Sequence, residues 1–144
     1  MAAVSLGVIL LLAGTLRASL EEAKAEPNLE KRSKLALDNA RQALTEARSA
    51  YAGGDNAQVE ARAGEIGESV ELAVTSLHQT GKNARKSPHW FKNAEIATRD
   101  LLRRLDSFQQ EMNAADRPLL DAVKGEVQQA HDTLLLGVIG SKEK

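Results

Sequence analysis

The stretch VEARAGEIGESVELAVTSL, residues 59–77, decides the fold of this chain. Its apolar residues recur at alternating spacings of four and three, which places them on one face of an α-helix. The residues on this face are Val59, Ala63, Ile66, Val70, Ala73 and Leu77. A helix with one apolar face must cover it with another element, so this stretch predicts a helix packed among other helices.

Three further stretches repeat this spacing, one with a polar member and one with a slip to a spacing of four at its end. Their apolar faces comprise Leu37, Ala40, Leu44, Ala47 and Tyr51; Phe91, Ala94, Thr98, Leu101, Leu105, Phe108 and Met112; and Leu120, Val123, Val127, Ala130, Leu134 and Val138. Four such faces joined by short connections predict an all-α domain over residues 26–144, an up-down-up-down antiparallel four-helix bundle with coiled-coil-like seams.

Turn and cap residues place the ends of the four helices. Gly53-Gly54 ends the first, which opens near Pro27, and Asp55 is a typical N-cap for the second. Ser87 before Pro88 predicts the start of the third helix. We expect helices over about 27–52, 56–80, 88–113 and 117–140. A pair of tetratricopeptide-like hairpins is the alternative, but that repeat is about 34 residues and these pairs span about 55.

Residues 1–25 are typical of a hydrophobic leader. No charge occurs from Ala2 to Leu16, and this apolar run is shorter than the roughly 20 residues of a comfortable membrane span. Ala23-Lys24-Ala25 provides the small-x-small pattern that signal peptidase recognises. We therefore expect a cleaved signal peptide and an exported protein, periplasmic or extracellular. An uncleaved membrane anchor and a helix within the domain are the alternatives.

Composition limits the partners of the chain. The 144 residues suffice for one domain, and the 27% of charged residues balance to a net charge of -1. A nucleic-acid-binding domain would carry a clear basic excess, so we expect no nucleic-acid partner. The chain has no cysteine, which excludes disulfides, thiolate nucleophiles and thiolate zinc sites.

Motifs for catalysis or cofactors are missing from the sequence. There is no nucleophile elbow, phosphate-binding loop or zinc-protease motif. The Glu-x-x-His pairs of di-iron bundles do not occur, and the first bundle helix has no Met to ligate a haem. Glu60, Glu65, Glu68 and Glu71 give the second helix an acidic face that we expect to be solvated. We therefore expect neither enzymatic activity nor a cofactor.

The three histidines suggest an alternative function. His78, His89 and His131 all fall toward one end of the expected bundle, where a metal or another small ligand could bind. None of them lies on an apolar face, and none has another ligand four residues away. We therefore expect them on the surface or at its boundary.

Glycines and basic residues have two expected roles. Gly64 and Gly67 are predicted to pack against the small-residue surface of Ala36, Ala43 and Ala50, with a notch for a ligand as the alternative. A basic strip is expected to meet the acidic face of the second helix, or to bind an external anionic partner. This strip consists of Lys82, Arg85, Lys86, Lys92, Arg99, Arg103 and Arg104.

Apolar residues outside the seams indicate a binding surface. The segment 134–139 is apolar on every face, and Trp90 points away from its seam as a lid or an exposed anchor. The predicted interaction residues are Trp90, Leu135, Leu136, Ile139, Arg85 and Lys86. We expect a non-enzymatic protein of the cell envelope that binds a protein partner or forms a homodimer.

Overall fold

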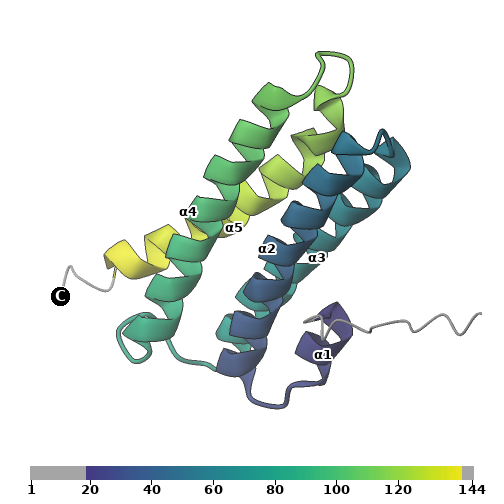
Figure 1. Cartoon of the computed structure of the whole chain (residues 1–144). Coiled ribbons are helices and arrows are strands. Elements are labelled where there is room, and N and C mark those ends of the chain that lie inside the picture. Colours follow the sequence, from purple (N-terminus) through teal and green to yellow (C-terminus); the bar gives the residue numbers. More distant parts are fainter. Residues whose placement is uncertain (1–18, 141–144) are drawn as a thin grey trace, which may run out of the picture.

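The computed structural model describes residues 19–140, and within this part it consists of helices and their connections. The four long helices are α2 (Leu29–Ala52), α3 (Asn56–Gln79), α4 (Pro88–Glu111) and α5 (Asp121–Gly140). Two short elements accompany them: α1 (Leu20–Ala25) and the 3-10 helix η1 (Arg117–Leu120). The long helices pack against one another, which confirms the predicted all-α four-helix bundle (Figure 1).

The bundle consists of two antiparallel hairpins, α2–α3 and α4–α5 (Figure 1). The hairpins lie side by side so that α2 packs against α4 and α3 packs against α5. Each of these two pairs is parallel, because the chain runs up, down, up and down through the four helices. The connection 80–87 therefore crosses one end of the bundle from α3 to α4. Toward its C-terminus, α5 passes behind α4 and away from α3.

The core is formed by the four predicted apolar faces. Every residue of these faces is buried except Tyr51, Ala130 and Val138, which are half-buried. Full burial of a Leu, Ile, Val or Phe side chain stabilises a fold by about 1.5–3 kcal/mol. These side chains therefore hold the bundle together, as the spacing predicts.

Two of the predicted helix starts need correction. The first bundle helix begins at Leu29, because the Asn28 side chain accepts a hydrogen bond from the Lys31 amide at 2.9 Å.

Asp55 caps α3 as expected, because its side chain accepts a hydrogen bond from the Gln58 amide at 3.1 Å. Ser87 precedes α4 but makes no side-chain cap. The last helix begins with η1, and α5 follows from Asp121.

Ser87 instead helps to fix the crossing connection. Its hydroxyl donates to Oε1 of Glu30 in α2 at 2.9 Å, and Nζ of Lys82 donates to the same oxygen at 3.0 Å. The hydrogen bond from Lys82, followed by that from Ser87, lowers the pKa of Glu30. The start of α2 is thereby tied to the connection between α3 and α4.

Helix α1 falls within the segment that the sequence analysis assigns to the leader. The Ser19 side chain caps it by accepting from the Glu22 amide at 3.1 Å. Ala23 is fully buried and Leu20 nearly so, and the helix packs against α2 and α3. The rest of the predicted leader, residues 1–18, lies outside the described residues. Packed structure therefore begins before residue 26.

Candidate functional site

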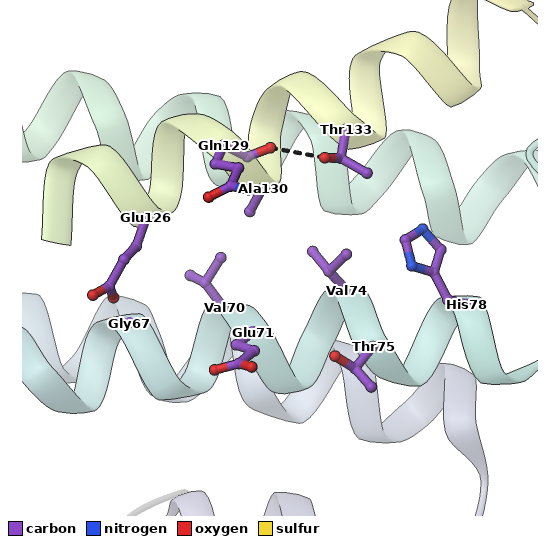
Figure 2. Close-up of a pocket in the computed structure, with 10 residues that line it drawn as sticks. All are labelled: Gly67, Val70, Glu71, Val74, Thr75, His78, Glu126, Gln129, Ala130 and Thr133. Atoms are coloured by element: carbon purple, nitrogen blue, oxygen red, sulfur yellow. Dashed lines mark hydrogen bonds between the residues drawn. The ribbon is translucent and has the colours of Figure 1, made fainter.

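A groove between α3 and α5 is the candidate functional site, and we call it the α3–α5 groove. It consists of two adjoining hollows of about 450 and 650 Å³, which share Gly67, Glu71 and Glu126. Figure 2 shows the first hollow, with the α3 side chains on one side and the α5 side chains on the other. The second hollow extends along α3 to Glu60 and reaches Pro118 in η1.

The floor of the groove is formed by small or medium-sized apolar side chains, and the polar side chains of Thr75, Gln129 and Thr133 line the first hollow beside them. Val70 and Val74 of α3 face Ala130 of α5 in the first hollow (Figure 2). In the second hollow the apolar lining is Ala63, Ala115, Pro118, Leu119, Ala122 and Val123. Val74, Leu119 and Ala130 are only half-buried, so solvent reaches part of this surface. Such a floor leaves space for apolar side chains supplied from outside.

Two glycines of α3 line the groove, and this corrects their predicted role. Gly64 is exposed, and a Cβ added there would meet open space. Gly67 is buried, but the group over it is the Glu126 carboxylate of α5, which a Cβ would displace (Figure 2). Neither glycine packs against the alanines of α2. Because neither glycine has a side chain, the groove stays open on the side of α3.

Carboxylates surround the apolar floor. Glu60, Glu68 and Glu71 of α3 and Glu126 of α5 line the two hollows, and all four are exposed. The lining includes no Lys or Arg, and its one histidine is His78. Within residues 19–140, no Lys or Arg forms an ion pair with any of these four glutamates. The groove therefore presents uncompensated negative charge.

The basic strip does not neutralise this charge, which was one of its expected roles. Arg99 pairs with Glu95 at 3.4 Å, and Arg103 pairs with Asp100, in both cases on the same helix. Lys82 pairs with Glu30, as described above. The strip therefore forms ion pairs mainly within α4 and at the crossing connection.

The structure separates the three histidines. His78 is exposed in the groove, and His89 is exposed and hydrogen-bonded to Asn93 at 3.1 Å. His131 is buried, whereas a position on the surface or at its boundary was expected, and its Nδ1 lies 3.2 Å from Oγ1 of Thr98. In the part of the chain that the structure describes, no three His, Asp or Glu side chains are grouped to hold a metal ion.

A buried polar cluster surrounds His131. Its Nδ1 lies 3.8 Å from Oε1 of Glu95, which is 8% exposed and pairs in turn with Arg99. The cluster is formed by α4 and α5, and neither Glu95 nor His131 lines the α3–α5 groove. Its polar atoms are directed at one another, so it joins the two helices of the second hairpin.

The predicted interaction residues lie away from the groove. Leu136 is 72% exposed and Ile139 is 47% exposed on the last turns of α5, where Leu135 is half-buried. Trp90 is half-buried and packs, like Val138, against the core cluster that contains Phe91. Arg85 and Lys86 are exposed in the crossing connection. The exposed apolar surface of these residues is thus confined to the end of α5.

The groove itself was missed in the sequence, although two of its signals were visible there. Gly64 and Gly67 lie inside a helix, and Glu60, Glu68 and Glu71 lie on one of its faces. The sequence predicts close helix packing for the glycines, with a ligand notch as the alternative, and a solvated face for the glutamates, because it does not show that α5 lies beside α3. Glu126 and Val74 carried no signal of their own.

Comparison with known proteins gives no match to this chain among family models, curated proteins or solved structures. The candidate site therefore depends on its own geometry. Across residues 19–140, no helix is both long and apolar enough to cross a membrane.

Proposed function

We propose that this chain is a non-enzymatic helical bundle that acts through protein–protein interaction, with the α3–α5 groove as its main binding surface. The observation that supports the proposal is the combination of an apolar floor with four unpaired carboxylates along one continuous groove. Grooves between helices are a common docking surface for a helix of another protein. The expected export to the cell envelope belongs to this proposal and is supported by the apolar run and the cleavage motif of residues 1–25.

The contacts of the buried ionisable side chains support the proposal of a non-enzymatic role. Glu95 and His131 contact each other and Thr98, and neither lines the groove. A general acid or base must reach a bound substrate, and this pair faces the interface of two helices. The carboxylates that line the groove are exposed to solvent.

Position-specific photocrosslinking tests the proposed surface. A benzophenone amino acid is placed at position 64 in the groove, at position 125 as a control, or at position 136 on the end of α5. Gly64 and Gly125 are matched, because both are exposed helical glycines with open space at the Cβ. We expect a discrete protein adduct in the native cells from position 64 and none from position 125. Identical patterns from the two positions would contradict the groove as the binding surface.

Self-association through the end of α5 is the second candidate, favoured by the exposure of Leu136 and Ile139. Exposed apolar side chains that lie close together are typical of contact sites. Light scattering of the wild type and of Leu136→Glu tests this candidate. A dimer that the substitution dissociates would support it, and a monomer over the whole concentration range would contradict it.

A further inference from the structure

We propose that the occupant of the α3–α5 groove is a cationic amphipathic helix of a partner protein. This inference rests on the proposed function and adds the chemical class of the partner. The observation that carries it is charge complementarity over an apolar floor, since Glu60, Glu68, Glu71 and Glu126 line the groove without a cation among them.

The length of the groove suits a helix. Along α3 the lining extends from Glu60 to His78, and 18 steps of 1.5 Å correspond to about 27 Å, or five helical turns. A partner helix of about 18 residues would place about five apolar side chains, one per turn, along this length.

The floor favours a partner that brings large apolar side chains. Gly64, Ala63, Ala122 and Ala130 contribute little side-chain volume to the lining, so the hollows remain open between the two backbones. Leu or Phe side chains of an incoming helix can enter where these small residues lie. The Glu126 carboxylate over Gly67 lies between the two hollows, where it can accept hydrogen bonds from a Lys or Arg beside them.

The negative charge of the groove favours a partner with positive charge. Elsewhere in the described fold, some carboxylates, such as Glu30, Glu95 and Glu111, have a basic partner at 3.0–3.4 Å, and others, such as Glu22 and Asp132, have none. The four groove carboxylates lack one although the whole chain is nearly neutral. A cationic helix would provide the missing counter-charges, whereas nucleic acid and anionic membrane surfaces would be repelled.

Other peptide conformations fit the groove less well. An extended peptide binds by adding a strand to a sheet edge, and the two walls here are helices whose backbone groups are paired internally. A polyproline helix docks on aromatic side chains, and the lining of the groove has none. The geometry therefore favours a helix.

The test uses the full chain and three synthetic 18-residue helical peptides. All three carry the same Leu face and differ only in their flanking residues, which are Lys, Gln or Glu. Binding is measured by fluorescence anisotropy of the labelled peptide at low and at physiological salt. We expect the Lys peptide to bind about tenfold more tightly than the Gln peptide, with an affinity that falls as salt rises, and the Glu peptide not to bind.

Four variants locate the binding site. Gly64→Leu fills the groove and should weaken the Lys peptide about tenfold, whereas Gly125→Leu, outside the groove, should leave it unchanged. The double variant Glu68→Gln and Glu71→Gln should weaken binding and flatten its salt dependence. Its control, Glu22→Gln with Asp132→Asn, removes the same charge outside the groove lining. Amide shifts in NMR spectra should map to α3 and α5.

Several outcomes would overturn the inference. One is equal affinity for the three peptides, and another is binding that Gly64→Leu does not affect. If Gly64→Leu dissociates a dimer seen by light scattering, the occupant is a second copy of this chain. If no peptide binds while position 64 still gives crosslinks, the proposed function stands and the cationic helix is wrong.

Discussion

Nδ1 of His131 in α5 lies 3.2 Å from Oγ1 of Thr98 in α4, and both side chains are buried. The Thr98 hydroxyl also lies 2.9 Å from the carbonyl oxygen of Glu95 and 3.0 Å from that of Ala94. A carbonyl oxygen can only accept, so the single hydroxyl proton is used there. With the hydroxyl proton directed to one of these carbonyl oxygens, Oγ1 accepts a hydrogen bond from His131 in the tautomer that carries its proton on Nδ1.

The first prediction is that His131→Ala destabilises the bundle by about 2 kcal/mol, because it leaves a cavity and removes this buried hydrogen bond. Urea unfolding followed by circular dichroism measures the loss. His78→Ala is the matched control, since His78 is exposed on α3, and it should change stability by less than about 0.5 kcal/mol. Equal effects of the two substitutions would show that His131 has no structural role.

Glu30 leads to a prediction about pH. Its pKa is lowered by the hydrogen bond from Lys82 and then by that from Ser87, so the folded state favours the charged carboxylate. The stabilisation is therefore fully present above the ordinary glutamate pKa of about 4.3 and is lost as pH falls through the lower folded-state value. We expect Glu30→Gln to be less stable than the wild type at pH 7, with a difference that shrinks toward pH 3.

Urea midpoints of both proteins across this pH range check the prediction. Lys82→Gln removes the larger cause of the lowered pKa, so Glu30→Gln should have a smaller effect in its presence. A difference between wild type and Glu30→Gln that stays constant with pH would exclude the proposed linkage.

The helices could be predicted because each apolar face is a property of one segment. At His131, apolar spacing alone does not identify the buried residue. Val127 and Leu134 are seven residues apart on the apolar face. Helical spacing allows the residue between them on that face to be either Ala130, three residues after Val127, or His131, four residues after it. Apolar spacing alone favours Ala130, because it is the apolar residue of the two. In the structure His131 is buried against α4, while half-buried Ala130 lines the groove beside α3.

The groove could not be predicted for a different reason. Periodicity shows which face of α3 is buried, but it does not show whether α4 or α5 lies beside it. The connection 80–87 crosses the bundle end and places α5 next to α3. This arrangement decides that Glu126 lies over Gly67 and that Glu68 and Glu71 remain unpaired.

Tyr51 is expected to join the two hairpins at the other end of the bundle. Its hydroxyl donates to Oδ2 of Asp116 at 3.0 Å and accepts from the Asn113 amide at 2.8 Å. Tyr51→Phe retains the ring contact with Phe108 but removes both hydrogen bonds. We expect a loss of about 1 kcal/mol, because these groups are partly exposed. Faster hydrogen exchange at the Asn113 amide, without a change at the Phe91 amide, would locate the effect.

The glycines of the long helices should respond differently to alanine. Gly64→Ala and Gly125→Ala add a methyl group in open space and should each stabilise the fold by about 0.5–1 kcal/mol through helix propensity. Gly67→Ala must displace the Glu126 carboxylate, the flexible end of an exposed side chain, so its gain should be smaller. Thermal unfolding ranks the three variants. A gain at Gly67 equal to that at Gly64 would mean that the contact with Glu126 contributes no stability.

Helix α1 provides the last prediction, which concerns the boundary after Ala25. A chain that starts at Glu26 lacks Ala23, which belongs to the core cluster containing Ala36 and Leu77, and the buried Leu20. We expect this chain to be about 1–2 kcal/mol less stable than one that starts at Ser19, because it loses the burial of the Leu20 and Ala23 side chains. Urea unfolding of the two chains measures the difference, and mass spectrometry of the natural protein identifies which start occurs. Equal stability would show that α1 is dispensable, and the predicted cleavage after Ala25 would then leave an intact bundle.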